Sequence, residues 1–173
     1  DRKIGCVVVR GAGDKAFCAG GDVKSMAAGR DQEKTYEDKV HDIRHRMRVS
    51  ELLHEMGKPT IAMVNGVAAG VGMSFALAAD IAIAGKSASF LQAFARIGLL
   101  PDGGSTWFLP RLAGDQRARA LAMLAPQIPA EKAKEWGLIW DVVDDAALMA
   151  TATETARKLA SGPTLALARI KGA

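Results

Sequence analysis

The sequence predicts an α/β fold, with a parallel sheet in its first part and a mainly helical region after it. Short β-branched apolar runs end at glycine-rich turns, and a small apolar helix lies between two of these runs. From Gly103 onward, helical patterns dominate. The 173 residues are 49% hydrophobic, 24% charged and 5% aromatic, which is typical of a globular domain and excludes a disordered or fibrous chain.

The first strand is expected at residues 4–10 (IGCVVVR), a β-branched apolar run that the turn Gly11–Asp14 ends. Such a run is typical of a parallel strand that is buried on both faces. A turn over Phe17–Asp22 and a short helical turn over Val23–Ala28 are expected next. The charged stretch Gln32–Met56 predicts a long helix, whose imperfect apolar stripe leaves most of its surface solvated.

The centre of the chain predicts a strand–helix–strand unit. Thr60–Val64 (TIAMV) has the pattern of a buried strand, and it leads into a turn at Asn65 and Gly66. Gly70–Ala79 is small, apolar and helical, and Asp80–Ala84 (DIAIA) is a third short strand. In units of this kind, ligands bind beyond the carboxyl ends of the strands, where helix N-termini converge.

The rest of the chain predicts helices over residues 105–112, 116–124, 130–136 and 145–160, with a brief strand over 139–143. We therefore divide the chain into a core (residues 1–114) and a helical C-terminal region (residues 115–173) that suits an oligomer interface. The chain starts at Asp1 and enters a strand almost at once. We therefore expect N-terminal structure to be missing and treat the chain as a fragment.

Composition also disfavours several classes of function. The formal net charge of +4 is dispersed and suits a polyanionic small ligand, but without a basic stripe we expect no nucleic-acid partner. The longest apolar stretch, Val67–Ala79, falls short of the roughly 20 residues that span a bilayer, so no membrane partner is expected. Cys6 and Cys18 lack paired spacing, which favours reduced thiols and a cytoplasmic location. His41 and His45 form an i, i+4 pair without a third ligand, so surface polarity is preferred over a metal site.

Two glycine-containing turns are the candidate functional site. They cover residues 16–22 and 65–72, and each follows a predicted strand and precedes a helix. Two backbone N–H groups aimed at one oxygen form an oxyanion hole, in which each donor is worth on the order of 3–4 kcal/mol to a transition state. The alternative is that the glycines only allow tight turns and close helix packing. Neither turn has the ending of a phosphate-binding loop or the dinucleotide spacing.

These turns and their surroundings resemble the crotonase superfamily, which is the enoyl-CoA hydratase/isomerase family. The motifs that carry the resemblance keep the family's order and spacing: AFCAGGDV (16–23), KPTIA (58–62), GVG (70–72), DIAIA (80–84) and EWGLI (135–139). The resemblance covers nearly the whole chain. It implies a crotonase-like spiral of ββα units without the family's first strands and last helices, and assembly as a homotrimer or as a hexamer (a dimer of trimers).

The resemblance implies that an acyl-CoA thioester is the substrate and that no separate cofactor is needed. It places the thioester oxygen between the backbone N–H groups of Gly21 and Val71. Val71 departs from the glycine that is commonest in the hydratases. The implied contacts with CoA fall in and around the first turn, on Phe17, Cys18, Ala19, Gly20, Asp22, Val23 and Lys24. Lys24 either meets a CoA phosphate or is a solvated lysine.

The carboxylates depart from the hydratase pattern. Hydratases of the family use two glutamates to position a water and move its protons, and the matching positions here hold Ser74 and Phe94, which we expect to contact the substrate. Asp102 matches the catalytic aspartate of several isomerases of the superfamily. Its surroundings (residues 98–107, GLLPDGGSTW) resemble the ring-1,2-epoxyphenylacetyl-CoA isomerases. The alternative for Asp102 is a helix N-cap without catalytic duty.

The leading hypothesis is an acyl-CoA isomerase, in which Gly21 and Val71 stabilise a thioester enolate and Asp102 removes and returns a proton. The expected substrate is a ring-1,2-epoxyphenylacetyl-CoA, with double-bond migration in enoyl-CoAs as a related activity. Two alternatives stay open. One is an enoyl-CoA hydratase, and the other is a non-catalytic acyl-CoA-binding homologue that has lost both glutamates.

Overall fold

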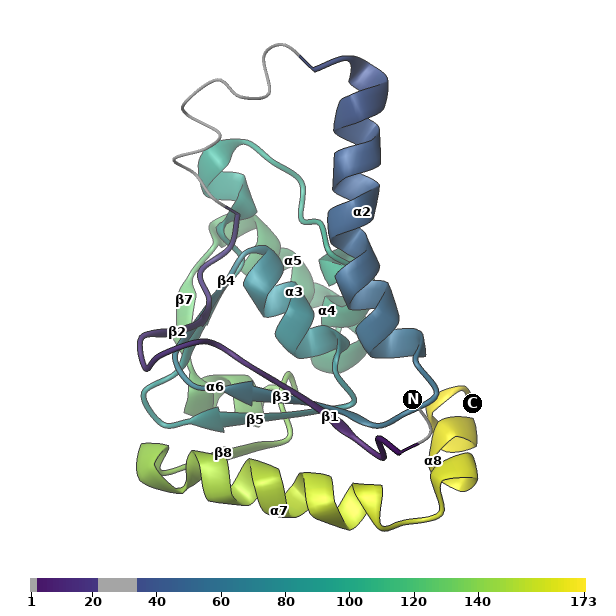
Figure 1. Cartoon of the computed structure of the whole chain (residues 1–173). Coiled ribbons are helices and arrows are strands. Elements are labelled where there is room, and N and C mark those ends of the chain that lie inside the picture. Colours follow the sequence, from purple (N-terminus) through teal and green to yellow (C-terminus); the bar gives the residue numbers. More distant parts are fainter. Residues whose placement is uncertain (1–2, 22–33) are drawn as a thin grey trace.

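The computed structural model describes residues 3–21 and 34–173 and arranges their strands in two four-stranded sheets (Figure 1). The first sheet has the order β1 (Val7–Arg10), β3 (Thr60–Val64), β5 (Ile81–Gly85) and β8 (Asp141–Val143), and all neighbours are parallel. The second sheet has the order β2 (Ala16–Cys18), β4 (Val67–Ala69), β6 (Ser89–Leu91) and β7 (Gln127–Pro129), and its β6–β7 pair is antiparallel.

The chain alternates between the two sheets, because β1 leads to β2, β3 to β4 and β5 to β6. Each turn of this spiral therefore adds one strand to each sheet. β7 and β8 come from residues 115–173. β7 is the last strand of the second sheet, and β8 is the last strand of the first. The predicted α/β class and the parallel order of the first sheet are confirmed.

The helices follow the strands or connect them. They are α2 (Tyr36–Glu55), α3 (Val71–Ala78), α4 (Ser105–Ala113), α5 (Asp115–Leu124), α6 (Ala130–Glu135), α7 (Leu148–Ala160), α8 (Thr164–Lys171) and the short 3-10 helices η1 (Ala93–Ile97) and η2 (Asp145–Ala147). None of the helices in the described part of the chain is long and apolar enough to cross a membrane.

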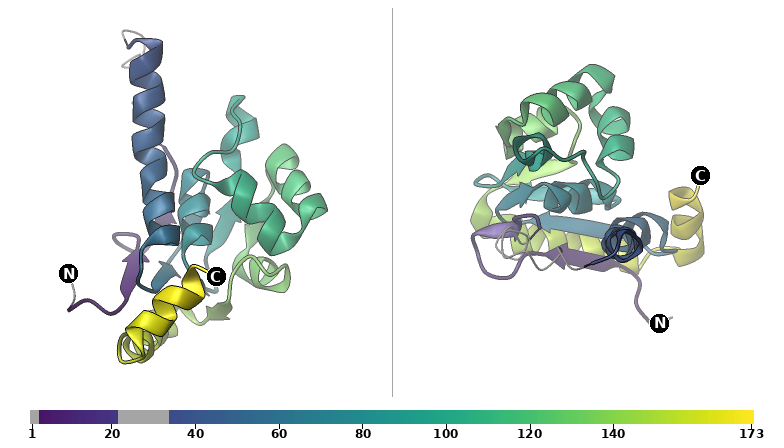
Figure 2. Two further views of the ribbon diagram at one scale, coloured as in Figure 1. Left: turned by 90° about the vertical axis from the view of Figure 1, so that its right-hand side faces the viewer. Right: turned by 90° about the horizontal axis from the view of Figure 1, so that it is seen from above.

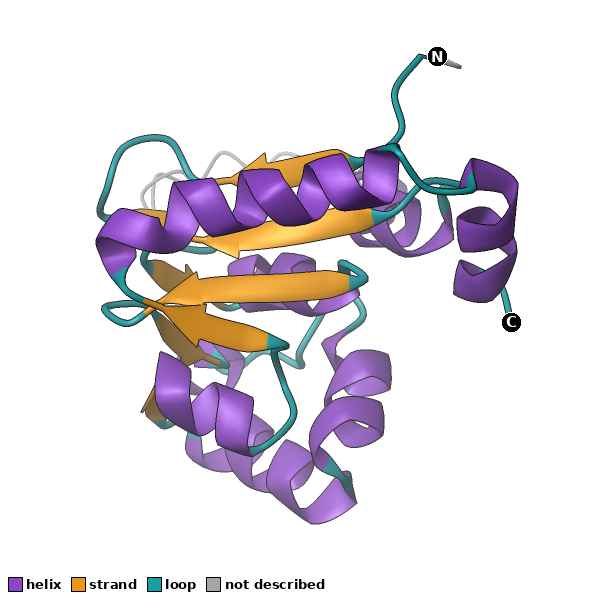
Figure 3. Cartoon of the chain, turned by 90° about the horizontal axis from the view of Figure 1, so that it is seen from below, coloured by secondary structure: helices purple, strands orange, loops and turns teal. Residues whose placement is uncertain are grey.

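The first sheet is covered on both faces, which explains why β3, one of its two central strands, is apolar at every position except Thr60. All five residues of β3 are buried. α7 runs along one face (Figure 3), where Leu148 and Ala152 pack against Ile61, Met63 and Ile83. α3 packs against β3 and β4 from within the main core, and its small side chains allow a close approach to the strands.

Helix α2 projects beyond the rest of the molecule (Figure 2). A capping box starts it: the Thr35 hydroxyl oxygen accepts from the Asp38 N–H, and the Asp38 carboxylate accepts from the Thr35 N–H, both at 3.2 Å. The later part of α2 packs against α3 and buries Ser50 and Leu53. The expected solvated helix is therefore present, within slightly narrower bounds.

Two expectations for the start of the chain are wrong. β1 is not buried on both faces, since Val8 is 40% exposed and the burial alternates along the strand. Its only partner among the described strands is β3, so β1 is an edge strand with one open side. The turn expected over Phe17–Asp22 begins later than predicted, because Phe17 and Cys18 belong to β2.

Candidate active site

The turns that follow β2 and β4 lie side by side, because these two strands pair in parallel and end at the same edge. Gly72 lets α3 approach β2 closely: a Cβ atom at this position would lie 2.1 Å from the carbonyl oxygen of Cys18. Gly70, just before α3, has φ 54° and ψ −124°, a conformation that favours glycine. The glycines therefore serve close packing, as the alternative interpretation proposed, and in doing so they bring the two turns together.

A cavity of about 370 Å³ opens beside these turns. The β2 turn contributes Cys18, Ala19, Gly20 and Gly21, and the β4 turn contributes Ala69, Gly70 and Val71. The remaining described lining comes from Val49 of α2, Phe75 of α3, Ala93, Phe94 and Ile97 of η1, and Leu99 and Asp102 of the next loop. The structure thus places Gly21, Val71 and Asp102 on one cavity.

The N–H groups of the second turn have different environments. The Gly70 N–H donates to the carbonyl oxygen of Leu91 at 2.8 Å, so the neighbouring strand uses this donor. Val71 is the first residue of α3, and an N–H group in a first helical turn has no acceptor within its own helix. The Val71 N–H is therefore the donor in this turn that suits a substrate oxygen.

Asp102 lies in the loop between η1 and α4 and is exposed. The interpretation of Asp102 as a helix N-cap is wrong, because α4 begins at Ser105 and its N-cap residue is Gly104, without a side-chain cap bond. The Asp102 carbonyl oxygen accepts from the Ser105 N–H at 3.1 Å and from the Ser74 hydroxyl at 3.0 Å. The loop is therefore fixed through its backbone, while the carboxylate belongs to the cavity lining.

Apolar side chains make up most of the remaining wall. Phe94 is buried, and its ring lies beside Gly70, since a Cβ atom there would be 3.7 Å from the Phe94 Cζ atom. Val49, Ile97 and Leu99 are each about half exposed. The cavity is therefore apolar around a single carboxylate among its described lining residues.

Some predicted contact residues lie elsewhere. Phe17 packs in the main hydrophobic core, and Ser74 is fully buried, hydrogen-bonded behind the cavity wall. Cys18, Ala19, Gly20 and Phe94 line the cavity, and their contact with a substrate stays a prediction. Asp22, Val23 and Lys24, together with the expected helical turn over 23–28, lie outside the described residues.

Sequence reasoning missed Val49, Phe75, Ala93, Ile97 and Leu99 as wall residues. Ala93 and Ile97 flank Phe94 in η1, so a search around that position could have found them. Val49 gave no local signal, because its place depends on how α2 packs against α3.

His41 and His45 lie on α2, and neither is among the described residues that line the cavity. The His41 and His45 rings stack with their centroids 6.4 Å apart on α2. No group of three or more histidine, cysteine, aspartate or glutamate residues within the described ranges is arranged to hold a metal ion. Both cysteines are free.

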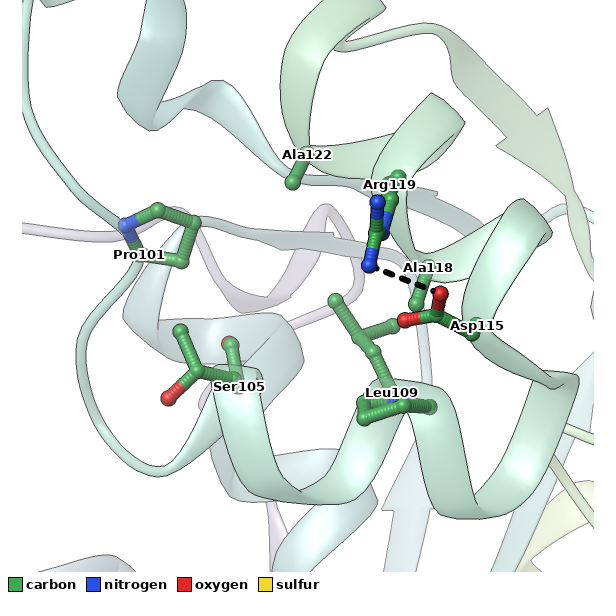
Figure 4. Close-up of a pocket in the computed structure, with 9 residues that line it drawn as sticks. Pro101, Ser105, Leu109, Asp115, Ala118, Arg119 and Ala122 are labelled. Carbon is green, nitrogen blue, oxygen red and sulfur yellow. Dashed lines mark ion pairs between the residues drawn. The ribbon is translucent and has the colours of Figure 1, made fainter.

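A second, smaller cavity of about 160 Å³ lies between α4 and α5 (Figure 4). Asp115 and Arg119 form an ion pair of 3.0 Å at its edge, and both side chains are largely exposed. Pro101 and Ser105 line this cavity, whereas Asp102 lines the larger one. Residues 101–105 therefore contribute lining residues to both cavities.

Comparisons with known proteins agree over nearly the whole chain. The family model described as enoyl-CoA hydratase/isomerase matches residues 1–173. A 1,2-epoxyphenylacetyl-CoA isomerase from Escherichia coli (strain K12) is 44% identical, over 100% of this chain and 65% of the relative. A probable enoyl-CoA hydratase from Rhodobacter capsulatus is 42% identical, over 96% of this chain and 63% of the relative.

A solved structure of an enoyl-CoA hydratase from Polaromonas sp. JS666 has a TM-score of 0.90 and 33% identity to this chain. The match covers 97% of this chain and 64% of that one, so the chain spans slightly less than two thirds of these relatives. The predicted crotonase-like fold is confirmed by this likeness. The paired sheets, the two converging turns and these matches agree with one another. They show that the chain belongs to the enoyl-CoA hydratase/isomerase family, the crotonase superfamily.

Proposed function

We propose that this chain carries the active centre of an acyl-CoA isomerase, in which a thioester enolate forms and one aspartate moves a proton. The observation that carries this proposal is that Gly21, Val71 and Asp102 line the same cavity of about 370 Å³. Two backbone donors and one carboxylate are the groups that such a reaction requires. The size and apolar wall of the cavity suit an acyl group.

The thioester oxygen is held by the N–H groups of Gly21 and Val71. Negative charge develops on this oxygen when a proton leaves the neighbouring carbon, and hydrogen-bond donors fixed by the fold stabilise such charge without rearrangement. Val71 also lies at the N-terminus of α3, where the helix dipole favours negative charge. Binding therefore stabilises the enolate more than the ground state.

Asp102 removes a proton from the carbon next to the thioester and returns the same proton to another carbon of the acyl group. In a 3-enoyl-CoA, the electron pair of the broken C–H bond moves into the dienolate, and the π electron pair of the former carbon–carbon double bond forms the new C–H bond. In the ring epoxide, the ring carbon–carbon bond that the epoxide bridges also breaks, and its electron pair becomes part of the double bonds of the oxepin. No atom is gained or lost. One carboxylate is therefore sufficient, and no water, oxidant or second acid is needed.

A hydratase is the second candidate, because a probable enoyl-CoA hydratase is 42% identical to this chain. Water addition requires groups that position the water, deprotonate it and protonate the substrate. Among the described lining residues, only Asp102 carries a carboxylate. Phe94 brings a buried ring to a position that holds a glutamate in hydratases, and this favours the isomerase. A non-catalytic acyl-CoA-binding homologue is disfavoured by a carboxylate at the cavity, which binding alone does not need.

The proposed substrate is a ring-1,2-epoxyphenylacetyl-CoA, and 3-enoyl-CoAs are proposed as related substrates. The apolar wall around Phe94 and the identity to the Escherichia coli isomerase support the aromatic acyl group. We also propose a cytoplasmic homotrimer or hexamer. Met123, Leu124 and Trp140 support self-association, since each is more than 70% exposed in the single chain.

The direct test is mass spectrometry of products after the full-length protein is incubated with a panel of acyl-CoAs. The panel contains the ring-epoxide thioester, a 3-enoyl-CoA and a 2-enoyl-CoA. From the first two we expect isomers, which keep the mass of the substrate but elute at a different chromatographic position and absorb differently, and from the third almost no product that is heavier by one water. Water addition as the fastest reaction would contradict the isomerase assignment. Calorimetry with each free acid is the control, and we expect the acids to bind far more weakly than their CoA esters.

A further inference from the structure

A buried polar network lies directly behind the cavity wall. Ser74, Gln92 and Ser105 are each fully buried. The Gln92 Nε2 atom donates to the Ser105 Oγ atom at 3.1 Å, and the Ser74 and Ser105 Oγ atoms are 2.6 Å apart. The Ser74 Oγ atom lies 3.0 Å from the carbonyl oxygen of Asp102. The network therefore ends on the backbone of the proposed acid/base.

The available partners fix the direction of these hydrogen bonds. Ser105 Oγ already accepts from Gln92, so its own proton is free to go to Ser74 Oγ. Ser74 then accepts from Ser105 and donates to the Asp102 carbonyl oxygen. In the opposite direction, the Ser105 proton would have no acceptor among the hydrogen bonds of the described residues. Both hydroxyl protons are satisfied only when Ser105 donates to Ser74. The Ser74 proton has two carbonyl acceptors, Asp102 at 3.0 Å and Gly70 at 3.4 Å, and the shorter bond is the one to Asp102. Aligned bonds of this kind strengthen one another.

The network joins three segments that supply the cavity. Ser74 lies one turn after Val71 on α3, Gln92 directly precedes η1, and Ser105 begins α4. The Asp102 segment packs closely against α3, since a Cβ atom at Gly103 would lie 2.9 Å from the Ser74 Cβ atom and 3.0 Å from the Val71 Cγ2 atom. Its backbone hydrogen bonds to Ser74 and Ser105 join this packing in fixing the segment relative to α3 and α4.

Stability alone does not explain this network. The Oε1 atom of Gln92 is buried and accepts no hydrogen bond from the described residues. A buried acceptor without a donor lowers stability. The network keeps a buried acceptor that lowers stability. A role in positioning the catalytic groups would explain why it does so.

We propose that Ser74 is a positioning residue, which holds the Asp102 carboxylate at a fixed place relative to the Val71 N–H by hydrogen bonding to the Asp102 carbonyl oxygen. This proposal rests on the proposed function, because it takes Asp102 as the group that moves the proton. From the sequence, we expect Ser74 to contact the substrate. In this proposal, Ser74 instead acts through its hydrogen bond to the backbone of Asp102.

The test is Ser74→Ala in the full-length protein, with 3-hexenoyl-CoA as substrate and the absorbance of the conjugated product as the readout. We expect kcat to fall on the order of 10-fold with KM nearly unchanged, because a displaced base slows proton transfer without weakening binding. Ser74→Cys keeps a weak donor and should give an intermediate kcat. The matched control is Ser50→Ala, another buried helical serine, whose hydroxyl has no partner among the described residues. Its kcat should equal that of the wild type.

A double-mutant cycle separates this proposal from the proposed function. If Ser74 acts through Asp102, Ser74→Ala should lower kcat no further in an Asp102→Asn background. Two results would overturn the positioning role and leave the proposed function standing. In the first, Ser74→Ala lowers kcat by the same factor in the wild-type and Asp102→Asn backgrounds. In the second, Ser74→Ala has the kcat of the wild type while Asp102→Asn is inactive. Full activity of Asp102→Asn would instead remove the proposed function itself.

Discussion

Gly72→Ala should separate the two turns that form the proposed oxyanion hole. A Cβ atom at position 72 would lie 2.1 Å from the Cys18 carbonyl oxygen and 2.7 Å from the Cys18 Cβ atom. Contacts of real Cβ atoms essentially never fall under 3.0 Å, so α3 and the end of β2 must move apart by at least 0.9 Å (3.0 minus 2.1). This shift separates Val71 at the start of α3 from Gly21 after β2.

The expected result is a loss of kcat/KM on the order of 100-fold, since a misplacement of about 1 Å in an active site has an effect of this size. Overpacking should also lower the free energy of unfolding by about 1–3 kcal/mol, partly offset by the helix preference of alanine, about 1 kcal/mol. Steady-state kinetics and a thermal melt measure the two effects. Gly57→Ala is the control, because its Cβ atom would meet its nearest neighbour at an ordinary 3.8 Å. Wild-type kcat/KM and stability in Gly72→Ala would refute the reasoning.

Two further predictions concern the chemistry of the cavity. Hydration of crotonyl-CoA should be slow or absent, because Ser74 and Phe94 stand at the positions that the family resemblance matches to the two glutamates of the hydratases. An absorbance assay that shows about 10 turnovers per second or more would contradict this. Cys18 lines the cavity, so a bound acyl-CoA should slow its alkylation by iodoacetamide, and an unchanged rate would argue against substrate at this place. Cys6 is the internal control, which the ligand should not affect. Burial raises the pKa of the Cys6 thiol, so its alkylation should begin at higher pH than that of an ordinary cysteine, since the thiolate reacts.

Most of the strands that the sequence predicted have enough residues to show a pattern, and β8, with three residues, is the exception. β3 and β5 have five residues each and are apolar except for Thr60. β3 has the expected bounds, and β5 begins one residue later than expected. The strands of the second sheet have three residues each, which is too short for a periodicity of two to stand out. α8 was also missed. The exposure of β1 depends on its place at the edge of the sheet, which is a property of the topology and not of the local sequence.

The candidate site was predictable where it follows from strand ends. The two glycine turns follow β2 and β4, and parallel pairing brings such positions together. The choice of Gly21 and Val71 within these turns came from the family resemblance. Asp102 was reached through the family resemblance, since neither spacing nor composition connects it with the two turns. The positions of Val49 and Ser74 relative to the cavity depend on how separate helices pack. A single sequence carries no direct signal for that packing.

The role of Asp102 is the central claim, and Asp102→Asn tests it most directly. The amide keeps the size of the side chain but cannot accept a proton from carbon. Isomerase turnover, measured beside acyl-CoA affinity and melting temperature, should fall roughly 100-fold or more, while affinity and melting temperature stay close to those of the wild type. A stable Asp102→Asn variant with wild-type turnover would contradict the account.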